Sequence, residues 1–360
     1  MSVPRISVII PCYNLGQFLD EAVNSVLAQT FQDFEILIVD DGSTDEDTVR
    51  LLADYDRPKT RVWRTPNRGQ AAARNLLIGH ATGDYLCALD ADDRLHPEYF
   101  AKALRQFDED PALTFVSAWV QEFGTHDSVW RQDRCDLPAL LAEDTVMTAA
   151  LVRRSAVISV GGEDEGMPAQ GDEDWDLWIR LVRAGYRGTI VPEILFNYRR
   201  RPGSISTVCT RGQVHLDLIR YLFRKHEDAY RQHLTEVLLW QDRRVAEALR
   251  MNDMRERERD GRLKTDIERV RAERDRLLRR RDHLLAQKES PTSPAVSGAS
   301  PPLLESQVSD AAAQCHALQT EYGRAREEVA ALRASASWRV TAPLRHAYDA
   351  WRALVGRRHS

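Results

Sequence analysis

A short run of mostly apolar residues, Tyr85–Leu89, is followed directly by three carboxylates, Asp90, Asp92 and Asp93. The run predicts a buried strand, so the carboxylates stand at its C-terminal end, which is the edge where open α/β sheets bind ligands. Carboxylates this close repel one another, and a divalent cation usually compensates their charge. Oxygen ligands beside a phosphate-bearing substrate favour Mg²⁺ or Mn²⁺. The alternative interpretation is an Asp-rich turn that caps the helix expected from about Pro97.

Two more predicted strands end in residues that suit a nucleotide. The strand Glu35–Val39 ends at an Asp pair that includes Asp41, and the strand Ile6–Ile10 runs into Pro11–Asn14. The three strand ends are expected to meet at one edge of the sheet. Tyr13 beside Asp41 suits a nucleobase, because an aromatic ring stacks on a base and a carboxylate accepts an N–H group from its edge. Each residue also has a simpler interpretation, Tyr13 as a rim aromatic and Asp41 as a helix N-cap.

A series of segments resembles the family 2 glycosyltransferases, whose nucleotide-sugar-binding domain has the GT-A fold. In chain order, the matching segments are Ile6–Asn14, Ser25–Phe34, Glu35–Asp45, Asn67–Asn75, Gly83–Pro97 and Gly171–Leu181. The resemblance covers about residues 4–206. It implies an inverting, metal-dependent enzyme that moves a sugar from a nucleotide-diphosphate donor to an acceptor hydroxyl. A UDP-sugar is the expected donor, and GDP- and dTDP-sugars are alternatives. Surface polysaccharide or glycoconjugate assembly is the expected context.

The resemblance also implies roles for the residues at the strand ends. Asp92 corresponds to the metal ligand of the family and Asp90 to the position near the ribose or donor sugar, while Asp93 flanks them. These three carboxylates are the predicted ligands of Mn²⁺ or Mg²⁺. Pro11, Tyr13 and Asp41 correspond to the nucleoside pocket of the family, and Asn14 is a further residue predicted to bind the donor.

Two arginines are further candidates for contact with the donor. Arg74 supplies a cation for the diphosphate or, alternatively, for a salt bridge that organises the acidic cluster. Arg201 stands where many members of the resembled family carry His. A guanidinium cannot ligate a metal as a neutral imidazole can, so Arg201 is expected to neutralise the diphosphate leaving group.

The candidate general base lies at the start of a predicted helix, in the pair Glu173 and Asp174. A helix N-terminus stabilises an anion there and keeps the carboxylate ionised. The resemblance places the base on Asp174, with Glu173 orienting the acceptor. Asp172 and Asp176 lie close in the chain, and their simpler interpretations are a capping residue and a surface position.

Other classes of protein fit the sequence less well. The segment after the first strand contains no G-x-G-x-x-G, which disfavours a nicotinamide-dependent dehydrogenase. A nucleotidyltransferase would normally show a Gly-rich phosphate loop at the same place. A catalytically inactive scaffold that acts through a coiled coil is the alternative from another class, but the joint presence of Asp41, Asp90, Asp92 and Asp174 favours an enzyme.

Residues 1–210 are predicted to form an α/β catalytic domain with a mixed, mainly parallel sheet. Strand and helix patterns alternate from residue 4 to 120, as a parallel sheet requires. Between 121 and 170 the pattern weakens, and mixed strands and loops are expected to shape the acceptor side. Further along, the sequence predicts a helix over 174–184, a strand over 189–197 and a polar loop over 199–206.

The rest of the chain is predicted to be helical and to mediate association. Residues 211–289 are charged and partly fit a coiled coil, 290–302 form a Pro/Ser-rich linker, 303–334 a coiled coil and 335–360 a basic amphipathic tail. Apolar or small residues recur at 3-4 spacing from Val308 to Leu332, which favours a homo-oligomer. The alternative is a helix that folds back onto the catalytic domain. The tail is suited to a membrane surface, a partner or the protein's own body.

Composition and charge limit which binding partners and which cellular location are expected. The net charge of −5 gives no reason to expect nucleic-acid binding, and five scattered cysteines without C-x-x-C fit a reducing cytoplasm. The N-terminus runs directly into a strand and no apolar run approaches a membrane span, so we expect neither a signal peptide nor a transmembrane helix. The expected partners are a nucleotide-sugar and a glycan or lipid-linked acceptor. The expected location is the cytoplasm, with contact to the inner face of the membrane through the tail.

Overall fold

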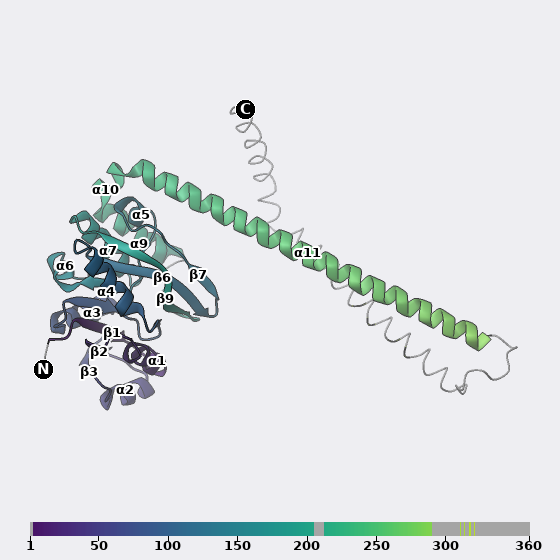
Figure 1. The fold of residues 1–360 in the computed structure, drawn as a ribbon, viewed down its shortest axis with the longest axis horizontal. Helices are drawn as coiled ribbons and strands as arrows, with labels where there is room; N and C mark the ends of the chain where they lie inside the picture. Colours follow the sequence, from purple (N-terminus) through teal and green to yellow (C-terminus); the bar gives the residue numbers. More distant parts are fainter. Residues whose placement is uncertain are drawn as a thin grey trace. The chain divides into compact units, whose positions relative to one another are not determined.

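The computed structural model describes residues 3–204 and 212–289, together with the isolated positions 310, 313, 317 and 320 (Figure 1). The chain contains two compact units, Met1–Arg243 and Arg244–Ser360. The predicted linker at 290–302 and basic tail at 335–360 lie outside the described residues, and so does the predicted coiled coil at 303–334 apart from those isolated positions.

The first unit is built on a mixed sheet that has nine strands in the described residues, in the order β3-β2-β1-β4-β8-β6-β9-β5, with β7 paired to β6. Parallel pairs join β1 to β2 and β4, β2 to β3, and β6 to β9, whereas β8 runs antiparallel to β4 and β6. The predicted mixed, mainly parallel sheet is therefore confirmed. The strands are β1 Ile6–Cys12, β2 Phe34–Asp41, β3 Thr60–Thr65, β4 Tyr85–Ala88, β5 Arg94–Leu95, β6 Phe115–Gly124, β7 Ser128–Trp130, β8 Leu151–Arg153 and β9 Gly188–Arg200.

Helices cover both faces of the parallel part of this sheet. Successive residues of β1 and β2 are buried, which explains their uninterrupted apolar sequence, because a parallel strand has no solvent-facing side. The helix α3 packs close to β1 and β2 through buried alanines, and Asp45 caps α2 by accepting from Thr48 N at 2.9 Å. The helices up to residue 183 are α1 Gly16–Leu27, α2 Glu46–Ala53, α3 Gln70–His80, α4 Tyr99–Glu109, α5 Leu137–Ala142, α6 Arg154–Ser159 and α7 Glu173–Arg183.

The register of the parallel strands places the predicted site residues together. Ile9 pairs with Leu37 of β2 and with Ala88 of β4, so the carboxyl ends of these three strands meet at one edge. The turn after β2 passes close to the loop before α3. Gly42 there has φ of +72°, and a Cβ would lie 2.4 Å from the backbone nitrogen of Asn67, so this turn requires glycine.

The strand β9 is longer than the sequence predicted. It continues to Arg200, where a polar loop was expected from 199, because its parallel pairing with β6 extends as far as Gly124 and Arg200. This pairing brings the backbone of Arg199 beside the acidic segment after β4. The weakly patterned segment from 121 to 170 contains the end of β6 together with β7, α5, β8 and α6.

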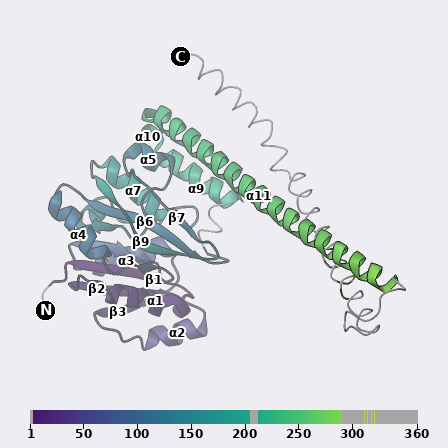
Figure 2. The ribbon, with the colours of Figure 1, turned by 45° about the vertical axis from the view of Figure 1, so that its right-hand side comes forward.

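The chain beyond residue 211 is helical, as predicted. It forms α9 Gly212–Lys225, α10 Glu227–Gln232 and α11 Leu234–Glu289. The first two and the start of α11 belong to the first unit, and α9 and α10 lie beside α5 and α7 (Figure 2). Leu218 and Leu222 of α9 are fully buried. The predicted domain limits at 210, 289, 302 and 334 remain predictions. Within the described residues, no helix is both long and apolar enough to cross a membrane.

Candidate functional site

A cavity of about 470 Å³ opens where the carboxyl ends of β1, β2 and β4 meet. It brings together predicted residues from four separate parts of the chain: Pro11, Tyr13, Asn14, Asp41, Asp90, Asp92 and Arg201. Its lining also includes polar residues that sequence reasoning did not select: Asn67, Gln70, Gln170 and Tyr198. Asn67 and Gln70 belong to a segment that carries the family resemblance, which could have identified them. Gln170 and Tyr198 have no comparable signal in the sequence.

One end of the cavity combines Tyr13 and Asp41. Tyr13 is 44% exposed, whereas Asp41 is buried. The two carboxylate oxygens of Asp41 accept hydrogen bonds from the backbone nitrogens of Arg68 and Gly69, each at 2.9 Å. The carboxylate is therefore held rigidly at the end of β2. Asp45 is the N-cap of α2, so the interpretation of Asp41 as the cap of that helix is wrong.

Asn14 fixes the shape of this end. Its side-chain oxygen accepts from the backbone nitrogens of Thr44 at 2.8 Å and Asp45 at 2.9 Å, and its own backbone has φ of +55°. The loop after β1 is thereby joined to the loop after β2. Asn14 lines the cavity, but its side-chain bonds hold these two loops together.

The other end is acidic and is built from two carboxylates. Asp90 accepts from Gln70 Nε2 at 2.8 Å, and Asp92 accepts from Arg201 Nε at 2.7 Å. Asp93 is buried and accepts from the backbone nitrogen of Arg199 at 2.7 Å, so it faces β9 and is absent from the described lining. No group of three His, Cys, Asp or Glu side chains able to hold a metal occurs in the described residues. The predicted three-carboxylate cluster is therefore not formed, because the extension of β9 engages Asp93.

The remaining pair is chemically suited to a hard cation. Mg²⁺ is usually bound by one or two carboxylates together with substrate phosphates and water. Asp90 and Asp92 both line the cavity and supply such oxygens. Burial raises the pKa of Asp92, and the nearby charge of Asp90 adds to this rise, while Arg201 opposes it. A divalent cation would favour the ionised carboxylate, so the donor set fits the predicted Mn²⁺ or Mg²⁺.

Arg74 lies beneath the acidic end and has the alternative role considered for it, a structural salt bridge. It is almost fully buried, and its Nη2 contacts Asp90 Oδ1 at 2.6 Å while Nη1 contacts Glu163 Oε1 at 3.2 Å. Burial raises the pKa of Glu163 to about 8, although Arg74 acts against that rise. Glu163 could not be predicted from the sequence, because this partner of Arg74 lies 89 residues further along the chain.

The candidate base lies in the first turn of α7. Asp174 accepts hydrogen bonds from the hydroxyl of Thr148 and from the backbone nitrogen of Trp175. Burial raises the pKa of Asp174, and the charge of Arg74 and the bond from Thr148 oppose this rise. Glu173 is also buried and accepts from Gly171 N at 2.8 Å. Neither is among the described lining residues of the large cavity, and Asp174 instead lines a second cavity of about 20 Å³.

Asp172 and Asp176, the carboxylates on either side of the candidate pair, differ in burial. Asp172 is half-buried, and its side chain makes no capping bond to α7. Burial, with repulsion from Asp174 and Glu173, raises the pKa of Asp172 to about 7. Asp176 is fully buried, so its interpretation as a surface residue is wrong. The reason is tertiary, because α9 and α10 cover that side of α7.

Comparisons with known proteins show which family the chain matches. The family model for glycosyl transferase family 2 matches residues 7–158. The chain is 30% identical over 208 residues to EpsE of Bacillus subtilis (strain 168), whose name places it provisionally among the glycosyltransferases; the match covers 55% of this chain and 74% of EpsE. It is also 37% identical over 115 residues to a hyaluronan synthase of Pasteurella multocida, which covers 32% of this chain and 12% of that protein.

Among solved structures, S. aureus TarS in complex with UDP-GlcNAc gives a TM-score of 0.49 at 19% identity, over 56% of this chain and 60% of that one. The fold and the site define a class of α/β proteins that have a mainly parallel sheet and a polar cavity at the carboxyl ends of its strands. Within that class, the chain belongs to glycosyl transferase family 2 and is a glycosyltransferase.

Proposed function

We propose that this glycosyltransferase is a metal-dependent, inverting enzyme that uses a UDP-sugar as its donor. The observation that carries the proposal is a single cavity with an aromatic ring and a fixed carboxylate at one end and two carboxylates with an arginine at the other. A nucleoside diphosphate has the same polarity, with a flat base at one end and a charged diphosphate at the other. Its sugar would then lie near the acidic end.

The base would occupy the end formed by Tyr13 and Asp41. The exposed ring of Tyr13 offers a stacking face. Oδ1 of Asp41 accepts from the backbone nitrogen of Arg68 and from Thr65 Oγ1, whereas Oδ2, which accepts from the backbone nitrogen of Gly69, has a lone pair that can accept the N–H of a uracil edge. Because backbone groups hold the carboxylate, little conformational freedom is lost when the base binds.

The diphosphate would occupy the end formed by Asp90, Asp92 and Arg201. A Mn²⁺ or Mg²⁺ held by Asp90 and Asp92 would neutralise charge on the diphosphate as the glycosidic bond breaks. Arg201 is partly buried beside Asp92 and adds a permanent positive charge at the same place. This charge stabilises the departing nucleoside diphosphate.

Asp174 is the proposed general base, with Glu173 orienting the acceptor. The N-terminus of α7 favours its ionised form, whereas burial raises its pKa and makes it a stronger base near neutral pH. The charges of Arg74 and Asp90, which belong to the acidic end of the donor cavity, also act on the pKa of Asp174, and this supports the proposed role. One base that deprotonates the acceptor hydroxyl is sufficient for a single in-line displacement with inversion.

The acceptor is proposed to be a growing glycan or a lipid-linked sugar. Relatives that are 36–38% identical to this chain over 115 or 116 residues include a hyaluronan synthase and two chondroitin synthases. Their names support a role in surface polysaccharide assembly. A cytoplasmic enzyme that reaches the inner face of the membrane through residues 335–360 fits this role. That tail lies outside the described residues.

A donor panel tests the proposal. We expect UDP-sugars with Mn²⁺ to raise the melting temperature and to be hydrolysed slowly in the absence of an acceptor, with GDP- and dTDP-sugars as comparators. Stabilisation by donor without hydrolysis would support the inactive scaffold. Pyrophosphate release from a nucleoside triphosphate and a sugar phosphate would support a nucleotidyltransferase.

A further inference from the structure

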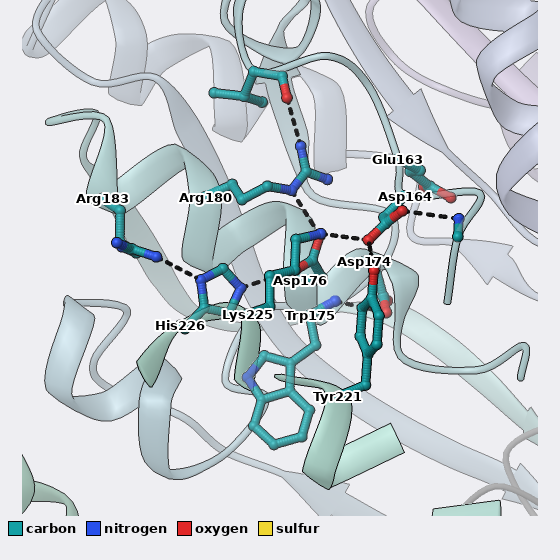
Figure 3. Close-up of polar contacts among 12 residues, drawn as sticks. Glu163, Asp164, Asp174, Trp175, Asp176, Arg180, Arg183, Tyr221, Lys225 and His226 are labelled. Atoms are coloured by element: carbon teal, nitrogen blue, oxygen red, sulfur yellow. Dashed lines mark hydrogen bonds and ion pairs between the residues drawn. The ribbon is translucent and has the colours of Figure 1, made fainter. Parts of the chain in front are cut away.

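A charged cluster outside the donor cavity connects α7 to the helices that follow the catalytic sheet. At its centre is Asp176, which is fully buried and accepts from Arg180 Nε at 2.6 Å, Lys225 Nζ at 2.8 Å and His226 Nε2 at 2.9 Å (Figure 3). Burial alone would raise the pKa of Asp176, but the bonds from His226, Arg180 and Lys225 prevail and hold that pKa well below its ordinary value. Asp176 is therefore a permanent negative charge inside the protein.

The hydrogen bonds around His226 define its neutral form. Arg183 Nη1 lies 2.8 Å from His226 Nδ1, and a guanidinium can only donate, so Nδ1 accepts. The proton of the neutral ring is then on Nε2, which donates to Asp176. His226 is almost fully buried. Its ring thus joins the N-terminus of α10 to two positions on α7.

Lys225 connects the end of α9 to α7 and to the loop before α7. Its Nζ also contacts Asp164, which accepts from Tyr221 of α9 at 2.7 Å as well. Asp164 directly follows Glu163, the buried partner of Arg74 beneath the donor cavity. Lys225 therefore bridges two carboxylates on different elements, one in the loop before α7 and one in α7 itself.

These contacts flank Asp174 without touching the donor cavity. Asp174 and Asp176 are two residues apart in a helix, so their side chains project from different faces, one toward Thr148 and the other toward Lys225 and His226. None of the residues of the cluster is among the described lining residues of the large cavity. Displacing α7 would therefore move the candidate base, whereas Tyr13, Asp41 and Asp92 stand at the ends of strands and would stay in place.

We propose that Lys225 and His226 are positioning residues for sugar transfer, which hold α7 and the loop before it so that Asp174 reaches the acceptor. The inference rests on the proposed role of Asp174 as the base. It makes α9 and α10 part of the catalytic apparatus, although they lie beyond the segments that carry the family resemblance.

The test uses the full-length chain, with UDP plus Mn²⁺ as the binding probe and hydrolysis of a UDP-sugar as the reaction. In Lys225→Met we expect turnover to fall between about tenfold and 100-fold, because small misplacements of catalytic groups have effects of this size, while the dissociation constant of UDP changes less than about twofold. The acidic limb of the pH–rate profile should also move, because the surroundings of Asp174 change. Lys225→Arg should restore most of the turnover, since it retains a cation between the two carboxylates.

Lys102→Met is the matched control. Lys102 also bridges two carboxylates, Glu98 and Glu193, and its side chain is 24% exposed against 26% for Lys225. Its partners are the N-cap residue of α4 and a residue of β9, and neither belongs to α7 or to the loop before it, so the turnover and pH profile of this variant should remain those of the wild type. Melting temperatures of both variants separate an altered site from a loss of folded protein.

The outcomes are distinguishable. Wild-type turnover and pH profile in folded Lys225→Met would overturn the positioning role, and so would an equal loss of UDP affinity. If Lys225→Met does not fold, His226→Gln takes its place. A Gln amide can still donate to Asp176, while its bond to Arg183 is altered. The same criteria for turnover, pH profile and UDP affinity apply to this variant. Full turnover in Asp174→Asn would show that the proposed base is wrong, and the positioning role would fall with it.

Discussion

Asp92 is the carboxylate for which Arg201 and the proposed metal ion would compete. In the structure Arg201 contacts it at 2.7 Å, and the proposed Mn²⁺ or Mg²⁺ would bind the same group. We predict that Asp92→Asn removes the Mn²⁺ dependence of UDP binding, because a neutral amide is a much weaker ligand for a hard cation. Titration calorimetry with UDP, with and without Mn²⁺, measures the effect.

Asp93→Asn is the control for that experiment. Asp93 is the adjacent carboxylate, but it is buried against the backbone of Arg199 and does not line the cavity in the part of the chain that the structure describes. Its variant should retain the Mn²⁺ dependence. Equal loss in both variants would restore the three-carboxylate site that the sequence predicted.

For Asp174 we predict a large loss of turnover with intact donor binding. A general base contributes roughly 10²–10⁴-fold to the rate, so Asp174→Asn should lower donor hydrolysis and transfer by that amount. The dissociation constant of UDP should stay close to the wild-type value. Retention of more than about a third of the turnover would contradict the assignment, and Glu173 and Asp172 would be examined next.

The stability of the fold should depend on the ionisation of Asp172. Its pKa is about 7 in the folded protein against an ordinary value of 3.8, because burial and the charges of Asp174 and Glu173 favour the protonated form. The folded state therefore binds this proton more tightly than the unfolded state does. The stability that results is fully present below about pH 4 and is lost as the pH rises through about 7.

Asp172→Asn removes this dependence. Urea unfolding at pH 5 and pH 8 should show a larger fall in the free energy of unfolding for the wild type than for the variant. The comparison isolates Asp172, since Glu163 and the other buried carboxylates are present in both proteins. An identical fall in the two proteins would mean that Asp172 ionises with its ordinary pKa.

At the scale of elements, α9 and α10 are part of the catalytic fold. Fully burying one leucine contributes about 1.5–3 kcal/mol, and α9 alone buries Leu218 and Leu222. We predict that truncation after residue 210 gives an insoluble or unfolded protein, since it removes these side chains, uncovers the face of α7 against which they pack and takes away Lys225 and His226, two partners of Asp176. Expression followed by size-exclusion chromatography and circular dichroism tests this.

Truncation after Arg243 is expected to give a folded protein that hydrolyses its donor. This cut retains the start of α11, where Val237 is buried and Trp240 Nε1 donates to Glu143 at 3.3 Å. A cut near residue 230, which the helical pattern alone suggests, would remove these contacts. Soluble, active protein from residues 1–210 would contradict the importance of all three helices.

At the scale of the whole molecule, we predict that the full chain self-associates and that residues 1–243 do not. The regular spacing from Val308 to Leu332 favours a coiled coil, although Ala311, Cys315 and Ala325 offer little apolar area against the entropy of association. Light scattering at tens of micromolar should give an oligomer for the full chain and a monomer for the truncated one. A monomeric full chain would refute the coiled coil.

The sequence by itself determined the sheet and one end of the site. Apolar runs closed by Asp41, Asp90 and Pro11–Asn14 specify parallel strands, and such strands necessarily bring their carboxyl ends to one edge. The lining residues Tyr13, Asp41 and Asp90 could therefore be predicted from local pattern, whereas Gln170 and Tyr198 could not. The family resemblance added the order of the segments and the enzyme class.

Only the tertiary structure decided which buried side chains are paired with which distant residues. Asp93 meets Arg199 across 106 residues, Arg74 meets Glu163 across 89, and Asp176 meets His226 across 50. A local pattern cannot specify such partners, because they depend on how far β9 extends along β6 and on where α9 and α10 pack. A buried polar or charged group is stable only with its partner, so packing placed Asp93 against β9, outside the described lining of the cavity, and made Asp176 an interior anchor for α7.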